Sequence, residues 1–195
     1  MYEEMKFDLD LEGISDKQLD VHLKLYSGYV KHANLISEQI EELEKDEEKN
    51  SFTIAELRRR FGYEFNGIRN HELYFHELEG DRTEPDKDST LNKMLAEQFG
   101  DFETWLEKFK KVGATRGNGW VALYYDKHAK NFLNAWVDEH HIGVLTQCET
   151  ILLMDVWEHA FMIDFTPATK KDYVETFFKN LNWKIVEDRA EKFLQ

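Results

Sequence analysis

Apolar residues recur at intervals of three and four along two long stretches in the N-terminal half of the chain. The first stretch begins after Ser15, which forms the Ser-x-x-Gln spacing of a capping box with Gln18, and it continues to Leu43. It predicts an amphipathic helix of about 30 residues. A second such stretch starts near Thr53. Between them the run 41–50, EELEKDEEKN, is nearly all charged and predicts a fraying helix end and a solvated turn. Two long helices joined by a short polar turn should lie antiparallel.

A shift in composition separates these helices from the rest of the chain. The segment 79–89, EGDRTEPDKDS, gathers turn formers and charges around Pro85. It favours a boundary between an N-terminal domain of residues 1–86 and a C-terminal domain of residues 87–195. Beyond the boundary, a helical pattern covers 91–109.

Three later segments are typical of β-strands. The runs 120–125 and 132–137 are β-branched and aromatic and flank a turn-like segment, and a third apolar run covers 150–156. Together they predict a small antiparallel sheet. Thr166 and Pro167 have the order of an N-cap and a first helical residue, so a further helix should follow. The predicted fold class is α+β, with a long N-terminal antiparallel α-hairpin and a C-terminal α/β domain that contains a three-stranded antiparallel sheet.

Charge and cysteine content narrow the classes of function. The 195 residues include 25 Lys and Arg against 39 Asp and Glu, a formal net charge of −14. Phosphate binding needs a dense cationic face, so nucleic acid is not an expected partner. Cys148 is the one cysteine, which excludes an intramolecular disulfide. No stretch approaches the roughly 18 apolar residues of a membrane helix, and the acidic start MYEEMKFDLDLEG does not resemble a signal peptide. We expect a soluble, cytoplasmic globular protein with no membrane partner.

Four residues with metal-ligating side chains stand at positions that can converge. Asp155 and His159 are four apart at the end of an apolar run, so a helix face or a strand-to-helix turn can present both to one ion. His22 and His71 lie on the apolar stripes of the two long helices and would face one another in a hairpin. Taken singly, each histidine is more commonly a core residue satisfied by a neighbouring group. If the four side chains share one ion, the ion removes the free-energy cost of leaving buried polar groups unpaired, about 1–3 kcal/mol each.

Three imidazoles and one carboxylate would leave one position of a five-coordinate iron or manganese ion open to a small ligand. Such mixed ligation suits an ion that cycles between +2 and +3. Competing motifs are weaker: the HExxxH that begins at His71 is one residue too long for a zinc protease, and the Glu-x-x-His of a di-iron bundle does not occur. Cys148 stands beside Glu149, which disfavours a reactive thiolate. The pattern favours redox chemistry on a very small substrate.

Several motifs spread over the whole chain resemble those of the iron/manganese superoxide dismutases. They are Asp155-Val-Trp-Glu-His-Ala160 after ILLM, the early helix with His22, the NH pair that ends in His71, GNGW at 117–120 and LNW at 181–183. The resemblance implies a helical N-terminal domain, a C-terminal α/β domain with a three-stranded antiparallel sheet, and a homodimer or homotetramer whose active sites lie near the subunit interface.

The resemblance also implies roles for individual residues. The metal ligands would be His22, His71, Asp155 and His159. The surrounding residues would be Trp120 and Trp157 as walls of the site, Tyr29 as guard of the solvent funnel, and Glu158 as a contact to His159 of the other subunit.

Two of the implied positions depend on spacing. His22 is seven residues before Tyr29, whereas the family ligand is usually eight residues before the corresponding tyrosine. The residue eight before Tyr29 is Val21, whose side chain has no atom that can bind a metal. The glutamine that usually hydrogen-bonds solvent in the site comes from one of two places in the family. Four residues before the second histidine ligand this chain has Gly67, and in the middle-strand region it has His140, with His141 as runner-up.

Other positions depart from the family pattern. Tyr26 stands where a histidine usually follows the first ligand by four, and Met162 stands where a tyrosine usually follows the last ligand by three. The usual hydrogen bond between those two residues therefore cannot form. Lys170 or Lys171 replaces the arginine near the funnel.

The expected cofactor is one iron or manganese ion per subunit. Gly67 favours manganese, whereas Leu153, where manganese-type members commonly have glycine, favours iron, so we expect a slight preference for iron with activity in both. The expected reaction converts two superoxide anions to dioxygen and hydrogen peroxide. An acidic protein can attract this anion if Lys170 and Lys171 make the funnel locally positive. Two alternatives remain: a metal-binding relative with little dismutase activity, and an acidic helical interaction module whose histidines are structural.

Overall fold

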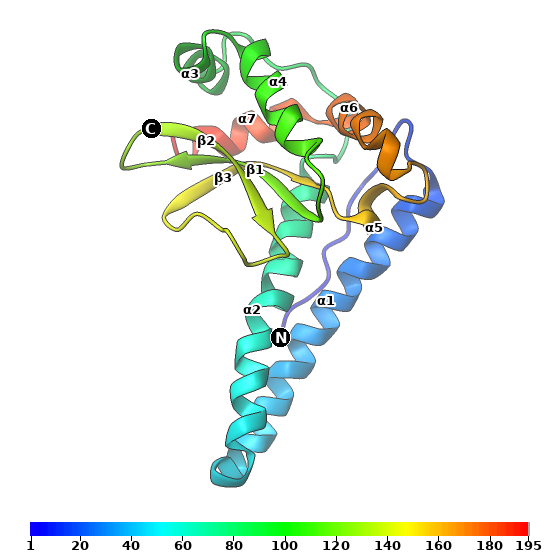
Figure 1. The fold of residues 1–195 in the computed structure, drawn as a ribbon, viewed down its shortest axis with the longest axis vertical. Helices are drawn as coiled ribbons and strands as arrows, with labels where there is room; N and C mark the ends of the chain where they lie inside the picture. The colour runs from blue at the N-terminus through cyan, green and yellow to red at the C-terminus, as the bar shows by residue number, and fades with distance from the viewer. Residues whose placement is uncertain (195) are drawn as a thin grey trace.

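A long pair of antiparallel helices forms one part of the molecule, and a three-stranded sheet with short helices forms the other (Figure 1). The computed structural model describes residues 1–194. In chain order the elements are α1 (Asp16–Leu43), η1 (Glu44–Asp46), α2 (Glu47–His76), α3 (Thr90–Phe99), α4 (Phe102–Gly113), β1 (Gly119–Asp126), β2 (Asn131–Asp138), β3 (Cys148–Asp155), α5 (Glu158–Phe161), η2 (Pro167–Thr169), α6 (Lys170–Asn180) and α7 (Trp183–Glu191). The predicted α+β class is confirmed. No helix among residues 1–194 combines the length and apolar character needed to cross a membrane.

The helical hairpin is longer than the charged run at its tip predicts. Helices α1 and α2 are joined by the three residues of η1, and most of 41–50 is helical. Glutamate and lysine are good helix formers, so the charged sequence continues both helices instead of fraying them. The Asn50 side-chain amide donates to the Leu43 carbonyl across the turn (3.0 Å). The hairpin tip therefore extends well beyond the sheet (Figure 1).

The start of α1 forms only half of the predicted capping box. Ser15 Oγ accepts a hydrogen bond from the Gln18 backbone N–H (3.1 Å), as expected of an N-cap. The reciprocal bond is absent, because the Ser15 backbone N–H donates to Asp164 Oδ2 instead (2.6 Å). The Gln18 side chain is thereby free to bond the distant segment around α5.

The predicted helical pattern over 91–109 is confirmed, and it is divided between two helices. Gly100 separates α3 from α4 with φ of +100°, a left-handed conformation that glycine adopts without a Cβ clash. Asp101 then caps α4, because its Oδ1 accepts from the Thr104 N–H (2.6 Å). Apolar spacing runs through the break because both helices pack against the sheet.

The sheet is antiparallel throughout, as predicted, and its strand order is β2-β1-β3. The central strand β1 is buried over nearly its whole length, in keeping with its apolar and aromatic sequence. Its register pairs Trp120 with Asp155 on β3 and with Val137 on β2. One predicted tryptophan wall and one predicted ligand thus lie side by side.

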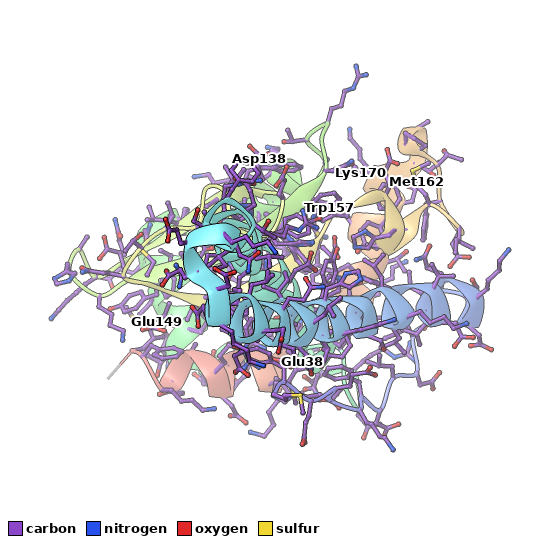
Figure 2. The ribbon with its side chains drawn as sticks, turned by 90° about the horizontal axis from the view of Figure 1, so that it is seen from below. Glu38, Asp138, Glu149, Trp157, Met162 and Lys170 are labelled. Atoms are coloured by element: carbon purple, nitrogen blue, oxygen red, sulfur yellow. The ribbon has the colours of Figure 1, made fainter. Side chains whose placement is uncertain are left out.

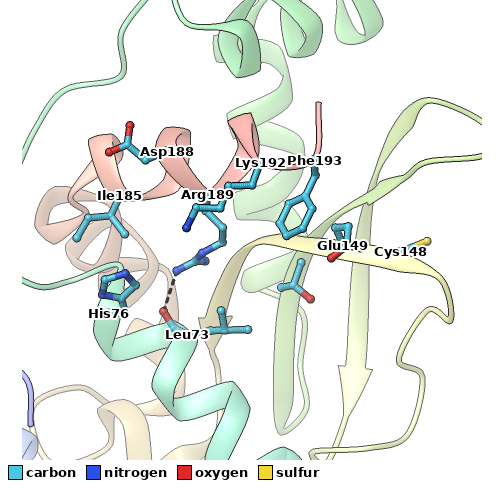
Figure 3. Close-up of a pocket in the computed structure, with 10 residues that line it drawn as sticks. Leu73, His76, Cys148, Glu149, Ile185, Asp188, Arg189, Lys192 and Phe193 are labelled. Atoms are coloured by element: carbon cyan, nitrogen blue, oxygen red, sulfur yellow. Dashed lines mark hydrogen bonds between the residues drawn. The ribbon is translucent and has the colours of Figure 1, made fainter. Parts of the chain in front are cut away.

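A buried contact between Glu77 and Arg189 fixes the end of α2 to the sheet. Glu77 Oε2 accepts from Arg189 Nη1 on α7 (2.7 Å), and Glu77 Oε1 accepts from the Leu153 N–H of β3 (3.2 Å). Arg189 also donates to the carbonyls of Ile151 (3.0 Å) and Leu73 (3.3 Å), the second of which is drawn in Figure 3. These bonds hold together the helix that carries His71 and the strand that ends in Asp155.

Candidate metal centre

Four buried or nearly buried side chains from four elements converge at one point. His22 comes from α1, His71 from α2, Asp155 from the end of β3 and His159 from α5. Their potential ligand atoms all lie within 4.8 Å of one another. The Nε2 atoms of His22, His159 and His71 lie 3.1, 3.2 and 3.6 Å from Asp155 Oδ2. The structure thus brings together the four residues that the sequence singled out as ligands.

His71 shows that this constellation fits a cation. Its Nδ1–H donates to the Gly67 carbonyl (2.6 Å), which leaves a lone pair on Nε2. That Nε2 is fully buried and has no hydrogen-bond partner within residues 1–194. An unpaired buried acceptor is costly, and here it points at a carboxylate, which offers no proton. A metal ion satisfies both groups, and three histidine nitrogens with one carboxylate oxygen suit iron or manganese.

The charge states of His22, His71 and Asp155 favour metal binding. Burial lowers the pKa of His22 and holds the pKa of His71 well below its ordinary value, so both imidazoles are neutral, the form that ligates metals. Burial acts to raise the pKa of Asp155, but its interactions with His159 and His22, hydrogen bonds included, outweigh burial and hold the pKa below its ordinary value. The Trp157 backbone N–H donates to Asp155 Oδ1 (2.8 Å), which leaves Oδ2 to face the histidines.

A hydrogen-bond chain runs beside the ligands from Trp120 through His140 to Tyr29. The Trp120 indole N–H donates to His140 Nδ1 (3.0 Å), and His140 Nε2 lies 2.7 Å from the Tyr29 hydroxyl. An indole N–H is a donor only, so Nδ1 is the acceptor and the proton of neutral His140 is on Nε2. Burial lowers the pKa of His140 to about 4, which keeps the ring neutral. His140 therefore donates to the Tyr29 oxygen, and the hydroxyl hydrogen of Tyr29 remains to be given to another group.

The ring of Tyr29 fills the space beside Gly67. A Cβ atom on Gly67 would lie 2.7 Å from Tyr29 Cδ1, closer than side chains approach in folded proteins. A larger residue there would force the Tyr29 ring to shift, and the Tyr29 hydroxyl is in contact with His140. His140 is fully buried with its ring centroid 4.7 Å from that of Tyr29, whereas His141 is exposed. Of these two candidates, His140 is the one beside the metal ligands.

The two predicted wall residues lie against the histidine rings. The Trp120 ring meets the His71 ring edge-on, with centroids 5.0 Å apart. The Trp157 ring stacks on His159 at 5.7 Å and on His140 at 5.2 Å. These contacts exclude water from the histidines on two sides.

Glu158 lies outside this cluster. It is exposed on α5, and its carboxylate makes no hydrogen bond or ion pair within the described chain. Its predicted contact requires a second subunit.

The residues that depart from the family pattern have other structural roles. The buried Tyr26 hydroxyl accepts from the Met5 N–H (2.9 Å) and donates to Glu72 (3.3 Å), so it fastens the N-terminal segment. Met162 is 41% exposed. Lys170 donates to the carbonyls of Thr115 (2.8 Å) and Gly117 (3.1 Å) and is 8% exposed, so its ammonium holds the loop before β1.

Lys170 and Met162, both labelled in Figure 2, border one hollow of about 550 Å³ together with Arg116 and Glu158. Lys171 borders a different hollow. Lys170 and Lys171, which were expected near one funnel, therefore border two different hollows.

Two polar residues near the ligands were missed from the sequence. Tyr173 on α6 donates from its hydroxyl to the Asp155 carbonyl (2.7 Å), and no local motif signals this contact. Gln18 is 1% exposed and bonds the backbone of α5. In the sequence, the indication that Gln18 lies near the ligands is its position four residues before His22, on the same helix face.

Comparisons with known proteins cover nearly the whole chain. Residues 87–189 match the family model of the C-terminal domain of iron/manganese superoxide dismutases. The chain is 31% identical to the iron superoxide dismutase of Aquifex aeolicus over 95% of this chain and 88% of that protein. It is 30% identical to the mitochondrial manganese superoxide dismutase of Glossina morsitans morsitans over 90% of this chain and 81% of that protein. It is 32% identical to manganese superoxide dismutase 2 of Haloferax volcanii over 73% of this chain and 76% of that protein.

Proposed function

The chain belongs to the iron/manganese superoxide dismutase family, and from that membership we propose how its own residues serve the reaction. It is a superoxide dismutase: two superoxide anions and two protons give one dioxygen and one hydrogen peroxide. This conclusion rests mainly on His71 Nε2. Its lone pair is buried among three other potential ligand atoms, and no neighbouring group in the part of the chain that the structure describes donates a hydrogen bond to it. That arrangement also argues against an interaction module with purely structural histidines.

We propose that the Nε2 atoms of His22, His71 and His159 and the Oδ2 of Asp155 hold the metal. An iron or manganese ion bound there supplies the one-electron oxidation and reduction of superoxide by cycling between +3 and +2. Among the two metals we propose a slight preference for iron with activity in both. Leu153, buried two residues before Asp155, supports iron in the light of the family pattern.

The proton path follows from the direction of the hydrogen-bond chain. We propose that Tyr29 is the group that donates a proton or hydrogen bond toward the substrate, because His140 has its single N–H committed to the Tyr29 oxygen. Trp120 keeps His140 in that tautomer, and together with Trp157 it excludes bulk water from the ligand rings. The burial of Tyr29 raises its pKa, so the hydroxyl keeps its proton at neutral pH.

The surroundings of α5 support an assembly of subunits. We propose a homodimer or homotetramer in which Glu158 contacts His159 of the partner subunit. Glu158 is exposed without a partner of its own, and Met162 and Ile163 beside it are about two-fifths exposed at 41% and 40%. Apolar side chains next to an unpaired carboxylate suit a surface that a second copy covers.

The domain division and the compartment are proposals of the same kind. We propose that residues 1–86 and 87–195 are separate domains, which the family match beginning at residue 87 supports. We also propose that the enzyme works in the cytoplasm, in keeping with its single cysteine.

Metal content and superoxide turnover measured on the same purified sample test the function. Protein produced with iron and protein produced with manganese should each contain close to one ion per subunit, and each form should be active, the iron form more so. His71→Ala protein should lose both metal and turnover. A metal-loaded wild-type protein without superoxide turnover would contradict the activity, and a more active manganese form would contradict the proposed preference.

A further inference from the structure

The helix that carries His159 is too short to hold its own position. Helix α5 contains four residues, barely one turn, and a single turn is unstable because it fixes several backbone angles for one hydrogen bond. Its last carbonyl groups and the N–H groups that follow need partners from elsewhere. The position of this metal ligand must therefore be set by contacts from outside α5.

Gln18 supplies two of those contacts from a different part of the chain. Its Nε2 donates to the His159 carbonyl (2.5 Å), and its Oε1 accepts from the Ile163 N–H (3.0 Å). The residue is 1% exposed, so both bonds are shielded from competing water. One amide thus fastens α5 at the ligand itself and at the chain that leaves the helix.

The same helix face also carries another ligand. Gln18 and His22 are four residues apart on α1, so their side chains project one above the other. The rings of His22 and His159 lie 5.1 Å apart, and both Nε2 atoms approach the same Asp155 oxygen. One turn of α1 therefore sets both the position of the first ligand and the position of the last.

We propose that Gln18 is a positioning residue that holds His159 in register with His22 and so closes the metal centre between α1 and α5. This inference rests on the metal centre proposed above and adds a residue that acts through the backbone of a ligand. Groups that orient metal ligands in this way typically change metal affinity about 10- to 100-fold when removed.

The decisive variant is Gln18→Met, which keeps the length of the side chain and removes both hydrogen bonds. Its matched control is Asn180→Leu. Asn180 is also buried, at 2% exposed, and its amide bonds the N–H and carbonyl of Glu12 (2.7 and 2.8 Å) instead of the segment that carries a ligand. Both variants remove a buried amide that joins two distant segments.

The measurements are the free energy of unfolding, the rate of iron release to an excess of chelator, and the visible absorption spectrum of the iron protein. Both variants should lose stability, but Gln18→Met alone should release iron at least about tenfold faster and alter the spectrum. Gln18→Glu is a second variant for the same measurements if Gln18→Met does not fold. It can still accept from Ile163, but at neutral pH it cannot donate to His159, so it should also release iron faster.

Iron release at the wild-type rate from a destabilised Gln18 variant would overturn the proposal, and so would equally fast release from Asn180→Leu. Failure of the proposed function itself is distinguishable, because the wild-type protein would then hold no iron or manganese. In that case none of the variants would differ in metal release.

Discussion

Gly67 offers the sharpest test of how the site is packed. Replacing it with alanine adds one methyl group to α2, and that Cβ would lie 2.7 Å from Tyr29 Cδ1 and 2.8 Å from Cγ. The Tyr29 ring is enclosed by the rings of Tyr63, His71 and His140, at 6.1, 5.1 and 4.7 Å. It cannot move aside without straining the 2.7 Å contact between its hydroxyl and His140 Nε2.

The expected magnitude follows from three contributions. Alanine is better than glycine in a helix interior by about 1 kcal/mol, which favours the variant. Overpacking a filled site costs about 1–3 kcal/mol, and the lost hydrogen bond costs about 1 kcal/mol more. Gly67→Ala should therefore lower the free energy of unfolding by about 1–3 kcal/mol.

Gly62 on the same helix provides the control. A Cβ at Gly62 meets no atom within 4 Å, so Gly62→Ala should keep the propensity gain and raise stability by about 1 kcal/mol. Urea unfolding of metal-loaded protein, at one protein concentration, gives the comparison. Turnover should fall in Gly67→Ala, because Tyr29 shifts, and should not change in Gly62→Ala. Equal stability of the two variants would refute the packing argument, and wild-type turnover in Gly67→Ala would refute the role of Tyr29.

Three further predictions concern other parts of the molecule. His140→Gln should change the ratio of iron-supported to manganese-supported turnover while the urea midpoint moves little, since glutamine can accept from Trp120 and donate to Tyr29; unchanged turnover with both metals would contradict the assignment. Burial raises the pKa of Glu77 to about 8 against the opposing effect of Arg189, so the folded protein binds this proton more tightly than the unfolded chain. That contribution to stability is fully present below about pH 4.5 and is lost as pH rises through 8. In the wild-type protein the free energy of unfolding, measured with urea, should therefore decline between about pH 5.5 and 8.5, and Glu77→Gln should flatten this decline. Parallel pH profiles of the two proteins would show that Glu77 is not responsible. Removing the metal should lower the melting temperature measured by calorimetry. The loss of stability should be about 2.7 kcal/mol if the free metal concentration had been a hundred times the Kd of the site. The same treatment should leave the melting temperature of metal-free His71→Ala unchanged.

The sequence predicts elements well where the signal is local. The two long helices follow from apolar spacing of three and four, and the three strands follow from two β-branched and aromatic runs and one apolar run. The pattern over 91–109 did not reveal the break between α3 and α4, because its apolar spacing continues through Gly100, whose left-handed conformation ends the first helix. The charged run 41–50 was misjudged because polarity was taken for a turn, although its residues are good helix formers.

The four ligands could be predicted because each has a local signature. Asp155 and His159 are four residues apart after an apolar run, and His22 and His71 interrupt the apolar stripes of two helices that were already expected to pair. His140 could be narrowed only to one of two adjacent histidines. The fold separated them, because it buries His140 against Tyr29 and leaves His141 exposed.

The sequence by itself determined the α+β class, the helical hairpin and the identity of the residues that converge on the metal. Tertiary structure alone decided which groups those residues and their neighbours bond. Lys170 donates to the Thr115 and Gly117 carbonyls, which no local pattern predicts, and the Gln18 side chain was expected to cap its own helix but bonds His159, 141 positions away. The reason is physical. Helix and strand formation depend on the spacing and propensity of neighbouring residues, whereas a buried polar side chain takes its partner from the unsatisfied backbone groups that packing places beside it.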